Sequence, residues 1–153
     1  MNLPLSFISA SREYADFGRQ VPAPYLRRAF TLSGPARDAV LTITGLGFYR
    51  VFVNGEEITK GILAPYISNP DDLIYYDQYE LADKLRPGEN VIGVILGNGM
   101  LNCFGGYIWD FDKARYRAAP MTALSLEGAT EAGESFFLES DTSFKTHPSP
   151  ILF

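Results

Sequence analysis

The amino-acid sequence predicts an all-β protein built as an antiparallel β-sandwich. Three observations support this prediction: short segments alternate between apolar and polar residues, turn residues separate them at fairly regular intervals, and helical periodicity is almost absent. Residues 81–85 are the exception, and there we expect about one helical turn before the Pro87-Gly88 turn.

The individual strands follow from alternation and from the turns between them. Residues 39–44 alternate with a period of two, which is typical of a strand with one face more buried. Residues 48–53 alternate again and lead into Asn54-Gly55, a pair that tolerates the positive φ angles of a type I′ hairpin turn. Residues 91–96 are almost continuously apolar, so we expect a central strand buried on both faces. The predicted strands cover residues 25–32, 39–44, 48–53, 56–59, 73–81, 91–96, 121–127 and 134–139.

Length and composition predict one folded domain. The chain has 153 residues, of which 46% are hydrophobic and 20% charged, and these values are typical of a globular protein. Pro22 and Pro24 lie in an irregular polar stretch, so we predict an N-terminal arm over residues 1–24 and a single β-sandwich domain over residues 25–153. The sequence ends on three apolar residues, Ile151, Leu152 and Phe153, from which we expect a piece of a longer chain.

Charge and targeting signals exclude several classes of partner. The 18 acidic residues outnumber the 13 basic ones, and no basic run is present, so we expect no nucleic-acid partner. Residues 90–109 carry no charge, but glycines and asparagines interrupt them, so we expect no membrane span. Residues 1–14 show no signal peptide, and the single cysteine, Cys103, permits no intrachain disulfide. The compartment therefore stays open between a cytoplasmic and an exported parent protein.

One segment, LGNGMLNCFGGYIWDFDKARY, combines a glycine-rich start with many aromatic and charged residues. Sugar rings stack their apolar faces on aromatic rings, and their hydroxyls bind acidic, amide and guanidinium groups. Three interpretations stay open for this segment: contact with a sugar, packing against another domain, or membership of the core. Its candidate binding or interdomain-contact residues are Tyr107, Trp109 and Tyr116 for stacking, with Asp110, Asp112 and Arg115 as polar partners.

Catalytic and metal sites find little support in the sequence. Asp110 and Asp112 would point to the same face of an extended chain, whereas glycoside hydrolysis needs two carboxylates facing each other across the sugar. The lone histidine, His147, lies on a predicted loop, and with one Cys it cannot complete a zinc site. Asp71, Asp72, Asn69 and Asp77 could supply oxygens to a structural Ca²⁺, although ordinary loop chemistry explains them better. We therefore predict no catalytic residue, no metal ligand and no cofactor.

Four segments taken together resemble a known family. They are GLGFYRVFVNGEEI, GILAPYIS, YYDQYELADKLRPGENVIGVILGNG and SDTSFKTHPSPI, and their order and spacing resemble the N-terminal β-sandwich domain of bacterial α-L-rhamnosidases. The resemblance covers roughly residues 24–151. Each segment alone is a weak signal, because Asn-Gly hairpins are common, but four in series are specific.

The resemblance implies a function and a set of partners. Members of this family are multidomain glycoside hydrolases that release terminal L-rhamnose, with their catalytic carboxylates on a separate (α/α) barrel. The sandwich is then of jelly-roll or galactose-binding-like type. We expect a non-catalytic, carbohydrate-associated accessory domain, inactive by itself, that helps to position a rhamnose-containing glycan or glycoside. The alternative is a purely structural scaffold that packs on the C-terminal domains of the parent chain and binds no sugar.

Two positions depart from the family pattern. Met100 stands where the family often has an aromatic residue after its glycine motif, which weakens the expectation of sugar stacking at that position. Phe144 stands where the family usually has tryptophan, a conservative exchange for which we expect a core position.

Overall fold

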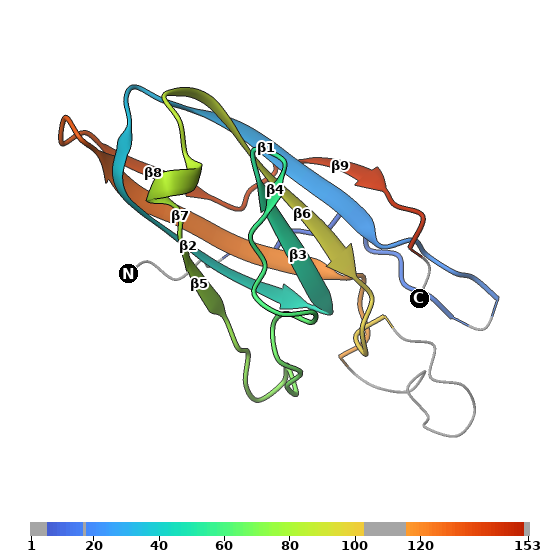
Figure 1. The fold of residues 1–153 in the computed structure, drawn as a ribbon. Helices are drawn as coiled ribbons and strands as arrows, with labels where there is room; N and C mark the ends of the chain where they lie inside the picture. The colour runs from blue at the N-terminus through green and yellow to red at the C-terminus, as the bar shows by residue number, and fades with distance from the viewer. Residues whose placement is uncertain (1–5, 17, 103–115, 152–153) are drawn as a thin grey trace.

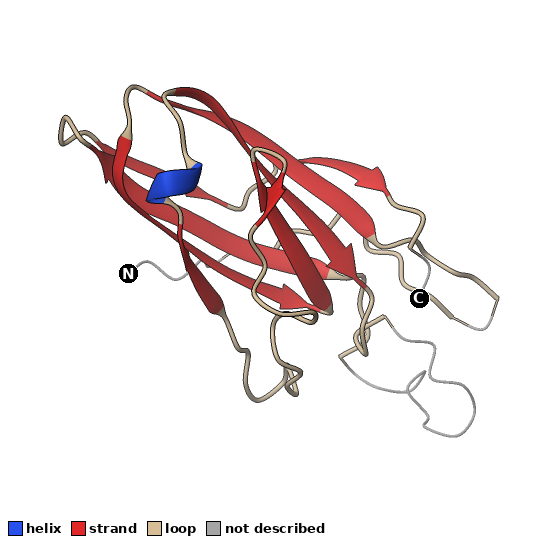
Figure 2. Ribbon diagram, viewed as in Figure 1, coloured by secondary structure: helices blue, strands red, loops and turns tan. Residues whose placement is uncertain are grey.

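The computed structural model describes residues 6–16, 18–102 and 116–151. In these residues strands dominate, and the helical structure is limited to a single 3₁₀ turn, η1 (Ala82–Lys84) (Figure 2). Over the same residues, no helix has the length and apolar character needed to cross a membrane. The predictions of an all-β protein and of one helical turn near residues 81–85 are confirmed. The division into an arm over residues 1–24 and a domain over residues 25–153 stays a prediction.

The strands form two stacked antiparallel sheets, which Figure 1 shows as two layers. Sheet I has the strand order β4-β3-β6-β1-β9, and sheet II has the order β5-β2-β7-β8. The strands are β1 (Pro24–Leu32), β2 (Ala36–Leu46), β3 (Phe48–Val53), β4 (Glu56–Glu57), β5 (Asp77–Glu80), β6 (Gly88–Gly97), β7 (Met121–Thr130), β8 (Ser135–Glu139) and β9 (Lys145–Pro148). This arrangement confirms the predicted antiparallel β-sandwich.

The core lies between the two sheets. Alternate residues of β3 and β6 supply it from sheet I, whereas in sheet II residues 41–45 of β2 and 122–126 of β7 are buried without alternation. The buried side chains include Leu26, Val51, Ile92, Val94, Leu41, Ile43, Leu124 and Leu126. Removing each of these side chains from water stabilises the fold by about 1.5–3 kcal/mol. Phe144 joins the same cluster, as expected.

The prediction that residues 91–96 are buried on both faces is wrong. In β6, Ile92, Val94 and Leu96 are buried, but Val91 and Ile95 are only partly buried. The outer face of sheet I has no second layer over it among the described residues. A continuous apolar run therefore does not require two covered faces.

Several other predicted strand boundaries differ from the structure: β2 (Ala36–Leu46), β6 (Gly88–Gly97) and β7 (Met121–Thr130) are each longer than expected. The strand expected over residues 73–81 is formed only at β5, because β5 pairs with β2 from Asp77 onward and the preceding residues turn away as a loop. The return strand expected over residues 56–59 ends at Glu57. The short strand β9 was not predicted, because its sequence KTHP shows no alternation of apolar and polar residues, and His147, expected on a loop, lies on this strand.

The Asn54-Gly55 turn is formed as predicted, with φ angles of 52° and 88°. The Asn54 amide donates to Asn90 Oδ1 (2.9 Å) and to the Lys84 carbonyl (3.0 Å). The fully buried Asn90 amide donates to the Arg86 and Gly88 carbonyls (2.7 and 3.1 Å) and accepts from Arg86 N–H (3.0 Å). Because both polar atoms of the Asn90 side chain have partners, its burial is not penalised.

The chain passes from sheet II to sheet I through one residue, Gly47, which lies between β2 and β3. Its φ angle is 98°, a region that side-chain-bearing residues rarely adopt. A Cβ atom at this position would also overlap the carbonyl oxygen of Gly97 on β6. Only glycine fits this corner without moving β6.

Several loops and connections gather at one end of the sandwich, where β1 begins and β6 ends. At the start of β1, Ala23 N–H donates to the Ile151 carbonyl (2.8 Å), and Ser149 N–H donates to the Ala23 carbonyl (3.0 Å). Residues 23 and 149–151 therefore lie side by side. The same end carries the Gly47 corner, the loop before β5 and the segment after β6 (Figure 1).

Replacing Gly47 by alanine tests the corner. We expect Gly47→Ala to lower the free energy of unfolding by about 3 kcal/mol, because it adds both backbone strain and a clash with β6. Chemical denaturation monitored by circular dichroism measures the change. Gly34→Ala is the matched control, because a Cβ there meets nothing within 4 Å, and it should change stability by less than about 1 kcal/mol. Equal effects of the two substitutions would contradict this account of the corner.

Candidate functional site

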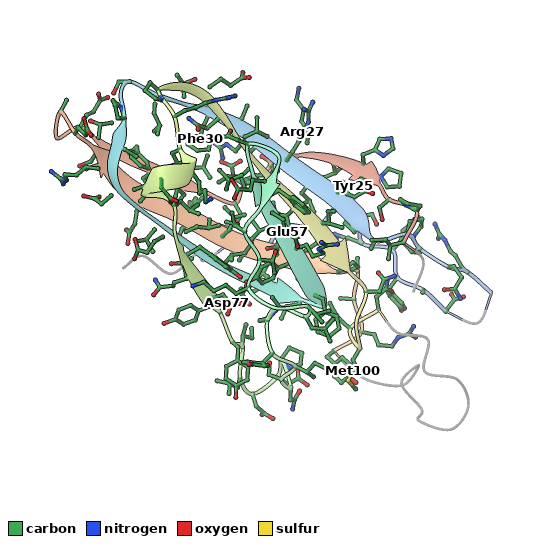
Figure 3. The ribbon with its side chains drawn as sticks, in the orientation of Figure 1. Tyr25, Arg27, Phe30, Glu57, Asp77 and Met100 are labelled. Carbon is green, nitrogen blue, oxygen red and sulfur yellow. The ribbon has the colours of Figure 1, made fainter. Side chains whose placement is uncertain are left out.

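A cleft of about 560 Å³ opens at the end of the sandwich where Gly47 lies. Residues 45–48 form its floor, residues 65–71 with Ile74 and Tyr75 form one wall, and Met100, Leu101 and Tyr116 form the other. In Figure 3 Met100 lies at this end of the molecule, beside the segment that follows β6. The volume of the cleft is in the range of sites that hold small ligands.

Glycines shape the floor of the cleft. Gly45 and Gly47 line it, and the Phe48 ring packs against Gly99, where a Cβ atom would approach the ring to 3.2 Å. Gly97 is in similarly close contact with Phe48 Cβ. The lack of side chains at these glycines therefore lets Phe48 and Tyr49 pack closely beneath the cleft.

One wall belongs to the loop between β4 and β5, residues 58–76, which we call the 58–76 loop. This loop exposes large apolar side chains to an unusual degree: Ile62 is 92% exposed and Tyr66 83%. Its exposed apolar residues are Ile62, Leu63, Tyr66, Ile67, Leu73, Ile74, Tyr75 and Tyr76. Exposed apolar clusters of this kind mark binding or interaction surfaces.

The base of the 58–76 loop is held firmly to the sandwich. Val51 N–H donates to Thr59 Oγ1 (2.8 Å), Tyr49 N–H donates to the Ala64 carbonyl (2.7 Å), and Thr44 Oγ1 donates to the Tyr75 carbonyl (2.6 Å). These bonds attach both ends and the middle of the loop. The exposed side chains are therefore presented from a loop whose backbone is anchored at residues 59, 64 and 75.

A chain of hydroxyl groups completes this attachment. The buried Tyr49 hydroxyl donates to Asp77 Oδ2 (2.5 Å) and lies 3.0 Å from the Tyr79 hydroxyl. The Tyr49 hydroxyl has a single proton, which it donates in the hydrogen bond to Asp77, so in the second bond the Tyr79 hydroxyl donates to Tyr49. The Tyr79 hydroxyl in turn accepts a hydrogen bond from Lys60 N–H (3.4 Å). Lys60 and Asp77, near the two ends of the loop, are thereby connected through two buried tyrosines.

This environment changes the acidity of Tyr49. Burial first, and then the hydrogen bond to Asp77, raise the pKa of Tyr49 far above its ordinary value of 10.0. Both effects disfavour the phenolate, which would lie in an apolar core beside a carboxylate. Tyr49 therefore acts as a hydrogen-bond donor and not as an acid in this site.

The tip of the 58–76 loop is a compact turn. Asp72 N–H and Leu73 N–H donate to the Asn69 carbonyl (3.0 and 2.9 Å), and Asp71 N–H donates to Asn69 Oδ1 (3.2 Å). The Asn69 amide also donates to Asp72 Oδ2 (2.5 Å). Of the four residues considered as calcium ligands, Asp77 lies apart, on the Tyr49 hydroxyl. In the part of the chain that the structure describes, no group of three or more His, Cys, Asp or Glu residues could hold a metal ion.

The other wall is held by asparagines. Asn102 Oδ1 accepts from Ala15 N–H (2.6 Å), and the Asn102 amide donates to Asn98 Oδ1 (2.9 Å). Ala118 N–H donates to the Leu101 carbonyl (3.3 Å), so the chain leaves and returns at one place. Tyr116 lines the cleft at that return.

The predicted site residues are only partly described. Tyr116 lies at the cleft, but Tyr107, Trp109, Asp110, Asp112 and Arg115 lie outside the described residues, so their roles stay predictions. Sequence reasoning did not identify Tyr66 or Tyr75. One signal was present: aromatic residues flank the turn formed by residues 68–72, and they were interpreted as part of a loop and a strand.

The Tyr49 hydroxyl can be tested by its effect on stability. We expect Tyr49→Phe to lower the free energy of unfolding by about 1–3 kcal/mol at about pH 7, because Asp77 and Tyr79 lose their partner. The Tyr66→Phe control, at an exposed position, should leave this value unchanged.

The same variant has a distinct pH dependence. Below pH 10 Tyr49 keeps its proton in both the folded and the unfolded chain, but above it only the unfolded chain loses the proton. The contribution of Tyr49 to the free energy of unfolding of the wild-type protein therefore falls by about 1.4 kcal/mol for each pH unit above pH 10. Denaturation midpoints measured up to about pH 11 should show the gap between wild type and Tyr49→Phe narrowing. A gap that stays constant would contradict the raised pKa.

Comparison with known proteins places the chain in a family. The protein-family model of the α-L-rhamnosidase N-terminal domain matches residues 34–153 of this sequence. An α-L-rhamnosidase of Formosa agariphila is 34% identical over 136 residues, which cover 86% of this chain and 14% of that protein. Among solved structures, an α-L-rhamnosidase from Aspergillus terreus has a TM-score of 0.80 and 26% identity, covering 95% of this chain and 17% of that one. The structure of an α-L-rhamnosidase from Dictyoglumus thermophilum has a TM-score of 0.71 and 31% identity, and the match covers 84% of this chain and 14% of that one. The chain thus spans only about a seventh of these proteins, and it belongs to the α-L-rhamnosidase N-terminal domain family.

Proposed function

We propose that this chain is a non-catalytic accessory domain of an α-L-rhamnosidase-like glycoside hydrolase, and that its cleft holds a sugar ring of the glycan substrate. The observation that carries the proposal is the lining of the cleft. Tyrosine rings and polar side chains are presented together there on a fixed backbone.

The chemistry of the lining suits a carbohydrate. Tyr66, Tyr75 and Tyr116 offer aromatic faces for the apolar side of a sugar ring. Asn69 and Asp71 lie on the same wall and offer an amide and a carboxylate for hydroxyl groups. Because the backbone is held by hydrogen bonds before any ligand arrives, little ordering is needed on binding.

The cleft favours binding over hydrolysis. Glycoside hydrolysis uses two carboxylates about 5–10 Å apart on either side of the scissile bond. Among the described residues that line the cleft, Asp71 is the sole carboxylate. We therefore assign cleavage of the glycan to another part of the parent enzyme.

A second function is favoured by a separate observation. Ile62, Leu63 and Leu73 are exposed but do not line the cleft. An apolar surface of this kind suits packing against another domain of the parent chain. In this alternative the domain is a scaffold, and the cleft holds no sugar.

Titration with sugars tests the proposed function. We expect L-rhamnose or a short rhamnosyl oligosaccharide to bind the chain with a Kd of about 1 mM, measured by calorimetry or by shifts of aromatic NMR signals. Tyr66→Ala and Tyr75→Ala should each weaken binding roughly fivefold, because each removes a stacking ring worth about 1 kcal/mol. Phe137→Ala is the control, since this exposed aromatic residue lies on β8 and does not line the cleft.

The scaffold alternative predicts different results. No sugar in the titration would then give a saturable response. In the full-length parent enzyme, Ile62→Ser combined with Leu63→Ser should increase proteolytic cleavage between this domain and its neighbours, because the apolar contact is lost. Under the sugar-binding proposal the same pair should leave the rhamnose affinity of the isolated chain unchanged, since neither residue lines the cleft.

A further inference from the structure

The outer face of sheet I carries a group of exposed aromatic and basic side chains that lies away from the cleft. On β1 and β9, Tyr25 is paired with His147 and Arg27 with Lys145 in the antiparallel register. All four residues are exposed. Figure 3 shows Arg27 projecting away from sheet II, with Tyr25 further along the same strand.

Arg27 and Lys145 form an unfavourable pair in the absence of a ligand. Like charges directly opposite each other on neighbouring strands destabilise a sheet. Neither side chain makes a hydrogen bond or ion pair with another residue in the described ranges. Five other cations in the described ranges do have a carboxylate partner: Arg19 with Glu13, Arg28 with Asp141, Arg37 with Asp38, Arg50 with Glu57, and Lys84 with Glu56. The pair is therefore available to an anion, in a chain whose net charge is -5.

A hollow of about 510 Å³ lies beside this pair, at the place where β9 begins and the remainder of β1 has no partner on that side. Arg27, Arg28 and Lys145 line it together with Glu89 and Ser143. Arg28 is fixed by Asp141 (2.7 Å) and by the Glu139 carbonyl (3.1 Å), so it forms a rigid wall. Arg27 and Lys145 remain to neutralise a bound group, while Glu89 limits the size of the positive region.

An aromatic ring lies next to the two cations. Tyr25 and Arg27 are two residues apart on one face of β1, a separation of about 7 Å, which is comparable to the width of a sugar ring. His147 Nδ1 donates to the Pro148 carbonyl (2.7 Å), which fixes the imidazole beside Tyr25. A ring that stacks on Tyr25 therefore places a charged substituent within reach of Arg27 and Lys145.

We propose that this face of β1 and β9 binds an anionic group of a glycan, with Arg27 and Lys145 holding the anion and Tyr25 contacting the sugar ring. The anion is a carboxylate of a uronic acid or a sulfate ester, since both present oxygens that a guanidinium binds in bidentate fashion. The inference rests on the proposed function in that it takes the ligand to be a glycan. It requires no contribution from the cleft.

The test is a titration of the chain with a galacturonic acid trisaccharide, a sulfated oligosaccharide of similar length and a neutral maltotriose. We expect one or both acidic oligosaccharides to bind and the neutral one not to bind, and the stronger of the two identifies the anion. Arg27→Gln combined with Lys145→Gln should weaken that binding by at least about tenfold, as expected for the loss of two charge-assisted contacts. Binding should also weaken between about 50 mM and about 500 mM salt.

The matched control is Arg12→Gln combined with Arg37→Gln, which changes the net charge equally at other places and should alter affinity less than about twofold. The unfolding midpoint of the Arg27/Lys145 double variant should not fall, because a like-charge pair has been removed. Absence of acidic-oligosaccharide binding, equal binding of maltotriose, or equal losses in the two double variants would each overturn the proposal.

The outcomes of this test and of the rhamnose titration are separable. The Arg27/Lys145 variant should keep the rhamnose affinity, and Tyr66→Ala should keep the affinity for the acidic oligosaccharide, because the two sets of residues line different hollows. Failure of acidic binding with intact rhamnose binding overturns this inference alone. Failure of rhamnose binding with intact acidic binding overturns the cleft proposal alone.

Discussion

The close approach of Gly47 to the Gly97 carbonyl is the contact on which the functional end of this domain depends. The chain leaves sheet II at Leu46 and enters sheet I at Phe48, so a single residue must change both its direction and its layer. Because that residue has no side chain, β3 can pair with β6 from its first residue, and the Phe48 ring can settle on the neighbouring glycines. The floor of the cleft and the attachment of the 58–76 loop through Tyr49 both follow from this corner.

The elements that sequence reasoning identified are those whose signals are local. Alternation placed β2 and β3, and the Asn54-Gly55 turn was identified because positive φ angles select those residue types. Errors arose where burial depends on a distant layer. The apolar run of β6 gives no sign in the sequence that one face of the strand is uncovered. Residues 73–76 have a strand-like composition, but no neighbouring strand pairs with them.

The candidate site was harder to predict for the same reason. Tyr66 joins Met100 and Tyr116 only because the corner and two loops meet at one end of the sandwich, and no local pattern reports that meeting. The pairing of Arg27 with Lys145 likewise appears only in the strand register, since the residues come from opposite ends of the sequence. By contrast, the four family-like segments allowed the family to be identified from the sequence, because they preserve order and spacing.

The hydrogen bonds between Ala23 and the segment 149–151 bring the beginning and the end of the sandwich to one point on its surface. The chain therefore enters β1 and leaves β9 at the same place on the surface, while the stretch before β1 is attached separately to sheet II through Ser6 and Ile8.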